Sequence, residues 1–126
     1  MADEKRSALA RWLLPGGTDP DPRFTLANER TFLAWIRTSL AFVAGGTALE
    51  GFTAEVFAAP LRTIVAALVI GIGILIGTGA AIHWLRVERR LRHGRSLPVP
   101  AIVPLLSAGA VLASVAALAM VLGATR

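Results

Sequence analysis

Cysteine is absent from this 126-residue chain, so it can form neither a disulfide framework nor a thiolate metal site. Charged residues are also scarce, at 17% against a hydrophobic fraction of 55%, which is too apolar for an ordinary small soluble domain. Lysine is nearly missing, because Lys5 stands alone and the net charge of +5 comes almost wholly from arginine. The composition indicates an integral membrane protein. Its basic side chains lie beside apolar spans, which favours phosphate groups on lipids or an anionic solute over nucleic acid.

The patterns of catalytic and metal sites are missing as well. His83 and His93 are ten residues apart, which is not a ligand spacing on a helix. Ser39, Ser107 and Ser114 have no nearby base of the kind that a hydrolase needs. We therefore predict a protein that is not an enzyme and that holds no metal or cofactor.

Three apolar stretches have the length needed to cross a hydrocarbon core of about 30 Å. They are residues 31–49, 61–84 and 103–122. We predict an all-α integral membrane domain of three transmembrane helices over residues 21–126. Residues 1–20 carry no apolar core of a cleavable signal peptide, and we expect them to form a mobile tail.

The segment before the first span is charged and also helical in character. Asp21-Pro22 is typical of a helix start, because Asp accepts the unpaired N–H groups of the first turn and Pro suits the first helical position. We predict a short amphipathic interfacial helix here, with a bend near Asn28 where it enters the span. Within the tail, residues 8–14 can form a short helix that touches the membrane surface through Trp12.

Arginines continue from this segment into the first span. Arg23, Arg30 and Arg37 recur every seven residues, so on one helix they lie close to one face. Arg37 lies about 10 Å beyond Arg30 at the helical rise of about 1.5 Å per residue. A guanidinium at that depth costs about 2.5 kcal/mol or more against lipid. Two interpretations stay open: the side chain reaches back to the headgroups, or it faces a protein interior or a wet pore.

Small residues indicate where helices pack. Gly73 and Gly77 form a GxxxG pair in the second span, and Gly45 lies on a small-residue face of the first. The loop between these spans carries Glu50 and Glu55, which we expect to be solvated.

Basic residues also set the orientation. They precede the first span and fill the loop over residues 86–100, so the positive-inside rule places the N-terminus and this loop in the cytoplasm and the C-terminus outside. A pair between Glu88 and Arg92 is expected from their i, i+4 spacing. Without interleaved aromatic residues the loop is a poor nucleic-acid surface. Its basic residues are Arg86, Arg89, Arg90 and Arg92.

Two stretches carry a family resemblance. ANERTFLAWIRTSLA, residues 27–41, resembles the signature of the YidH-type bacterial membrane proteins, the domain of unknown function 202 family. WLRVERRLRHGRSLP, residues 84–98, resembles the second stretch of those proteins. The resemblance covers nearly the whole chain from Asp21 onward, and it implies a multi-pass protein of the bacterial cytoplasmic, or inner, membrane.

That family is similar in turn to the membrane domain of the eukaryotic vacuolar transporter chaperone complex, whose three-helix subunits form a ring around a polyphosphate-conducting channel. This resemblance implies a ring of about five subunits. It also places Arg23, Glu29 and Arg30 at a charged entrance. The eukaryotic protein has an arginine directly after the His-Trp of its second span, whereas here Leu85 follows Trp84. No polyphosphate-synthesising domain is present in the sequence, so another protein would have to make that ligand.

The residues and the resemblance lead to one principal hypothesis, a homo-oligomeric ring in the lipid bilayer that binds or conducts phosphate-type anions, with polyphosphate as one candidate. Stacked rings of Arg23, Arg30 and Arg37 would contact the phosphate oxygens, and Asn28 and Glu29 would brace or gate the arginines. The alternative is a non-conducting adaptor whose basic loop binds anionic lipid headgroups or a partner protein. A polar oligomer axis would favour the first, and a dry apolar axis the second.

Overall fold

The computed structural model describes residues 7–97 and 102–124, and this part of the chain is helical without a strand. The other positions of the predicted tail and basic loop, residues 1–6 and 98–100, lie outside the described residues. The helices are α1 (Ala8–Leu13), α2 (Pro22–Phe52), α3 (Ala59–Arg92) and α4 (Ile102–Ala124). The last three each contain a stretch long and apolar enough to cross a membrane, which confirms the predicted all-α class with three spans.

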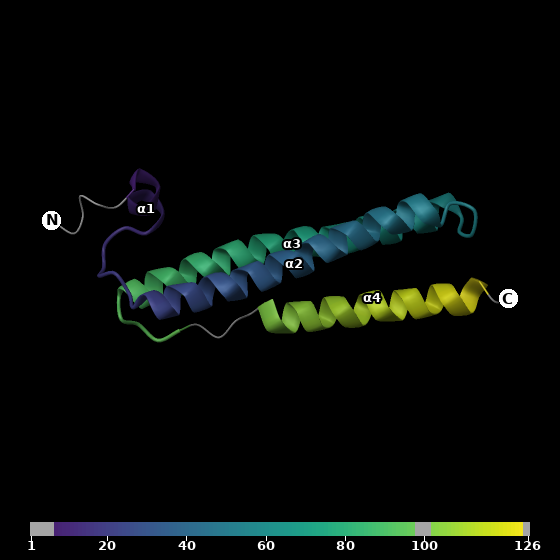
Figure 1. The fold of residues 1–126 in the computed structure, drawn as a ribbon. Helices are drawn as coiled ribbons and strands as arrows, with labels where there is room; N and C mark the ends of the chain where they lie inside the picture. Colours follow the sequence, from purple (N-terminus) through teal and green to yellow (C-terminus); the bar gives the residue numbers. More distant parts are fainter. Residues whose placement is uncertain (1–6, 98–101, 125–126) are drawn as a thin grey trace.

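Two long antiparallel helices form the body of the molecule. α2 and α3 lie side by side along their length, and α4 runs beside them in the direction of α2 (Figure 1). α1 lies at the end where α2 begins and α3 finishes, whereas the α2–α3 loop lies at the opposite end (Figure 1). The arginines near the start of α2 and those near the end of α3 are thus brought to the same end of the bundle.

α2 begins as the sequence predicts. The Asp21 side chain accepts a hydrogen bond from the backbone N–H of Arg23 at 2.9 Å, and Pro22 is the first helical residue. The helix then continues without interruption to Phe52. The segment expected to form an interfacial helix makes up the first turns of α2, and its Asn28 is buried against α3.

Small residues allow α2 and α3 to approach closely. Ser39 Oγ donates a hydrogen bond to the carbonyl oxygen of Gly73 at 2.6 Å. A Cβ added at Gly73 would lie 2.9 Å from the Ser39 carbonyl oxygen, and one added at Gly77 would lie 2.9 Å from Ser39 Oγ. A Cβ at Gly45, in contrast, would meet open space. Within this chain α2 packs against α3 through the neighbouring Gly46, which is buried, and not through Gly45.

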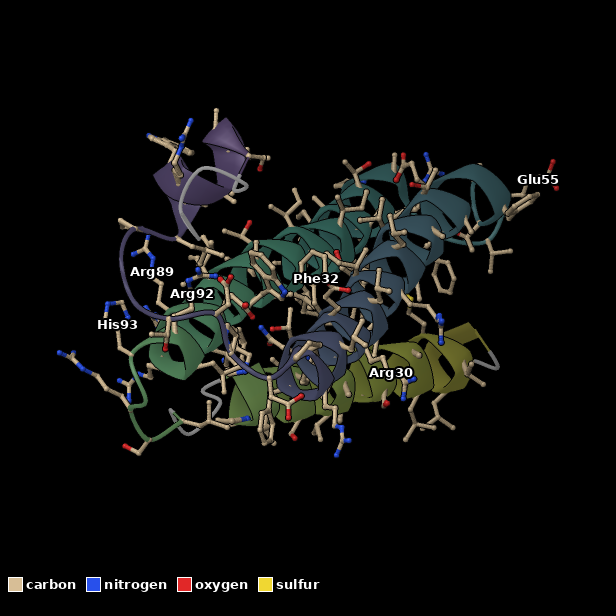
Figure 2. All side chains as sticks on the ribbon, turned by 60° about the vertical axis from the view of Figure 1, so that its left-hand side comes forward. Arg30, Phe32, Glu55, Arg89, Arg92 and His93 are labelled. Atoms are coloured by element: carbon tan, nitrogen blue, oxygen red, sulfur yellow. The ribbon has the colours of Figure 1, made fainter. Side chains whose placement is uncertain are left out.

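An ion pair joins the far ends of the two helices. Arg62 Nη2 lies 3.3 Å from Glu50 Oε1, and Thr63 Oγ1 donates a hydrogen bond to the same oxygen at 3.3 Å. Glu50 is therefore a helix-joining residue, and the expectation that it is merely solvated is corrected. Glu55 is exposed and points away from the helices at the tip of the loop (Figure 2).

α4 is only lightly attached to the rest of the chain. Its contacts are with α3, where a Cβ at Gly109 would lie 3.3 Å from Ile72 Cγ2. Its large apolar side chains are exposed around the helix, among them Val111, Leu112 and Leu118. A helix that is apolar on all sides requires lipid or another protein chain around it, so most of the α4 surface is available for such contacts.

Candidate functional site

The three arginines of α2 share its outer face. The buried residues of α2 face α3, through the hydrogen bonds of Asn28 and Ser39. At about 100° per residue, the arginines fall on the opposite side of the helix. All three are exposed, and Arg30 projects from the side of α2 that is turned away from α3 (Figure 2). They are Arg23, Arg30 and Arg37.

The guanidinium groups of these arginines make no hydrogen bond or ion pair with any residue in the described part of the chain. Arg37 in particular does not face an interior formed by its own helices, although it lies about two turns beyond Arg30 inside an apolar stretch. Its guanidinium must therefore reach the headgroups, a water-filled space or another chain, because burial in lipid alone costs about 2.5 kcal/mol or more. Of the surroundings that the sequence left open for Arg37, the structure excludes an interior formed by the described helices of its own chain.

The side chains of Asn28 and Glu29 make no hydrogen bond or ion pair with the arginines of α2 among the described residues. Asn28 is 7% exposed, and its Nδ2 donates to the carbonyl oxygen of Trp84 at 3.2 Å and to Glu88 Oε2 at 3.4 Å. Glu29 is exposed and lines a groove between α2 and α3. Within this chain Asn28 joins the two helices and Glu29 faces a different side from Arg30, so the predicted bracing contacts with the arginines are absent from the described residues.

A buried carboxylate is the centre of the contact between α2 and α3 at this end. Glu88 is 3% exposed. Thr25 Oγ1 donates a hydrogen bond to its Oε1 at 3.1 Å, and Asn28 Nδ2 donates one to its Oε2. This cluster was not predicted from the sequence. The i, i+3 spacing of Thr25 and Asn28 places both on one face, but nothing in the sequence shows that Glu88 turns toward them. No group of three or more acidic or histidine side chains among the described residues is placed to hold a metal.

The predicted pair of Glu88 with Arg92 is wrong, because the Arg92 side chain turns toward the N-terminal segment. Arg92 Nη2 lies 2.6 Å from Asp19 Oδ1, and the Arg92 side chain is 7% exposed. Arg89 Nε donates to the Leu13 carbonyl oxygen at 3.2 Å. Figure 2 shows Arg89 and Arg92 on the side of α3 near α1. Residues 13–19, expected to belong to a mobile tail, are thus held against the end of α3.

The basic end of α3 presents fewer free cations than the sequence suggests. Arg92 is buried, and Arg89 and Arg90 each donate to a backbone carbonyl oxygen, that of Ser96 at 2.9 Å in the case of Arg90. Arg86 is exposed, and its side chain makes no hydrogen bond or ion pair within the described residues. Some of the arginines predicted to bind lipid therefore make hydrogen bonds or an ion pair within the chain instead.

Residues 23–90 match the family described as Domain of unknown function (DUF202). The chain belongs to this family. The DUF202 match begins at the first arginine of the α2 face and covers the Glu88 cluster and the close packing at Ser39. It stops before the buried Arg92 and before α4.

Two relatives of this DUF202 protein cover most of their own length in the match, and the name of one gives a location. Inner membrane protein YidH of Escherichia coli is 45% identical over 87 residues, which cover 65% of this chain and 71% of YidH. An uncharacterized protein of Mycobacterium tuberculosis is 36% identical over 103 residues, which cover 82% of this chain and 84% of that protein. No solved structure matches significantly. With its three long apolar helices, the DUF202 chain is a multi-pass protein of the bacterial inner membrane, as predicted.

Proposed function

We propose that this protein is a homo-oligomer that binds or conducts phosphate-type anions through the arginine face of α2. The observation that carries the proposal is the exposure of Arg23, Arg30 and Arg37 on one face, without a partner in the described part of the chain. Arginine suits phosphate because its planar guanidinium contacts two oxygens at once.

Assembly with the α2 faces turned inward would remove the cost of Arg37. Each guanidinium exposed to lipid costs about 2.5–3.5 kcal/mol, whereas arginines around a hydrated axis keep their water or exchange it for anions. Ala34 and Ala41 lie four residues beyond Arg30 and Arg37 on this face and are exposed. Such small residues let neighbouring helices approach. The resemblance to the vacuolar transporter chaperone membrane domain supports a ring of about five subunits.

Cysteine cross-linking tests the assembly, because the chain has no cysteine of its own. In oxidised membranes Ala41→Cys should form covalent dimers through the α2 face. Leu75→Cys is the matched control, since it is 58% exposed on α3 at a similar depth. Cross-linking at Leu75 but not at Ala41 would refute an assembly centred on α2.

Electrical recording tests the function. Reconstituted protein should give anion-selective currents that Arg30→Ala and Arg37→Ala reduce, because each change removes one charge per subunit from the proposed pathway. Arg95→Ala, at an exposed position beyond α3, should leave the currents intact. Currents that are cation-selective, or an absence of both current and polyphosphate binding, would overturn the proposal.

The adaptor stays the second candidate, because Arg86, Arg89 and Arg90 are exposed together at the end of α3. Under this alternative, replacing these three residues by alanine would weaken binding to anionic headgroups. The α2 arginines would then anchor the helix at the interface, and Arg30→Ala would leave that binding unchanged.

A further inference from the structure

An apolar groove of about 470 Å³ lies between α1, α2 and α3, away from the arginine face. Its aromatic wall is formed by Phe32 and Trp84, whose ring centroids are 6.4 Å apart with the planes tilted by 55°. Figure 2 shows Phe32 pointing between the two long helices. The apolar side chains that line the groove are Leu13, Phe32, Leu33, Ala81, Trp84 and Leu85.

The groove lies at the charged end of the predicted spans, where headgroups would meet acyl chains. Asn28 is hydrogen-bonded to Trp84, so the part of α2 just beyond Asn28 lies opposite residues 81–85. These positions lie between the charged end of the bundle and the long apolar part of the helices. Tryptophan is enriched at this boundary. An apolar groove that opens toward lipid at this level is suited to an acyl chain.

Two charges of opposite sign lie at the groove or next to it in the fold. Glu29 lines the groove, is exposed and has no partner within the described residues. Arg89 lies one turn beyond Leu85 on the same face of α3 and donates its Nε to the carbonyl oxygen of Leu13. Its two terminal nitrogens make no hydrogen bond in the described part of the chain. A carboxylate in the lining and a guanidinium bonded to Leu13, another lining residue, are thus available to a ligand.

We propose that this groove is a binding site for a zwitterionic aminophospholipid of the phosphatidylethanolamine type. One acyl chain fills the apolar groove, the phosphate contacts Arg89 and the primary ammonium contacts Glu29. These two charges match those of this headgroup, whereas Glu29 would repel a headgroup that carries only negative charge. The site is independent of the proposed anion function, because it lies on another face from Arg30.

Lipid binding to the purified full chain tests the site by native mass spectrometry. The probes are phosphatidylethanolamine, phosphatidylcholine and phosphatidylglycerol with identical acyl chains. Phosphatidylethanolamine should bind about tenfold more tightly than the other two, a difference of about 1.4 kcal/mol. Phosphatidylcholine keeps the charges, but its trimethylated nitrogen cannot donate a hydrogen bond to Glu29.

Variants separate the two contacts. Glu29→Gln should reduce the preference for phosphatidylethanolamine over phosphatidylcholine, because its amide oxygen accepts a weaker hydrogen bond than the carboxylate, and Arg89→Ala should weaken binding of all three lipids about tenfold. The matched controls are Glu55→Gln and Arg95→Ala, both exposed and distant in the fold from the groove, and they should bind as the parent does. Equal binding of the three lipids, tighter binding of phosphatidylglycerol, or equal losses in Arg89→Ala and Arg95→Ala would overturn the site.

Discussion

The contact between Ser39 and Gly77 predicts two substitutions whose effects do not add. A Cβ at Gly77 would lie 2.9 Å from Ser39 Oγ but 3.7 Å from Ser39 Cβ, which is an ordinary van der Waals distance. Gly77→Ala therefore collides with the hydroxyl alone. Ser39→Ala removes that hydroxyl, and with it the hydrogen bond to the Gly73 carbonyl oxygen. Ser39→Ala should therefore make room for the methyl group of Gly77→Ala.

The expected free energies follow from these contacts. Ser39→Ala removes one hydrogen bond between membrane helices, which is worth about 0.6 kcal/mol on average and at most about 1.7. The Gly73 carbonyl keeps its bond within α3, so no buried acceptor is left unpaired. Gly77→Ala alone should cost about 1–3 kcal/mol through overpacking. The double variant should cost no more than Ser39→Ala alone, so the coupling free energy is about 1–3 kcal/mol.

Unfolding of the four proteins in mixed micelles, titrated with a denaturing detergent, measures this coupling. Gly73→Ala is the contrasting variant, because its Cβ would meet the Ser39 carbonyl oxygen and Val43 Cγ2, each at 2.9 Å. Ser39→Ala leaves both atoms in place and should not rescue it. Additive losses in Ser39→Ala and Gly77→Ala, or rescue of Gly73→Ala, would refute the packing of α2 against α3 described above.

Two further predictions concern the polar end of the bundle. Asn28→Leu should destabilise the protein by about 1–3 kcal/mol in the same titration, because the buried Glu88 carboxylate loses a hydrogen-bond donor. Glu88→Gln should cost less stability than Asn28→Leu, and equal losses in the two variants would contradict this prediction. Gly17→Ala should release the N-terminal segment, because its φ is +74° and its Cβ would lie 2.6 Å from a carbonyl oxygen of α3. Hydrogen exchange at the Thr18 amide measures the release, and Gly94→Ala, with φ +61° and open space around it, should cost only about 1–2 kcal/mol of backbone strain and leave that amide protected.

Much of the architecture was predictable because membrane burial acts on long stretches of sequence. A run of apolar residues of lipid length must be a helix or part of a barrel, since its backbone groups find no water to bond. The three spans and the helix start at Asp21 follow from such local rules. The family was predictable because its motif is long and continuous over residues 27–41, which lie inside the matched region.

The side-chain partners were not predictable in the same way. Glu88 and Arg92 have the spacing of a helical ion pair, yet one turns to Asn28 and the other to Asp19. That choice depends on how α3 is rotated against α2 and on where residues 13–19 return to the bundle. The weak i, i+4 attraction, a few tenths of a kcal/mol, yields to hydrogen bonds that satisfy a carboxylate buried between the two helices.

By itself, the amino-acid order determined three lipid-length helices and a seven-residue arginine repeat, since both are properties of one segment and its helical period. Only the tertiary structure decided that the repeat faces away from α3 and that Glu88 lies buried beneath Asn28. The physical reason is that a helix fixes which residues share a face, whereas the packing of a second helix decides which face is covered.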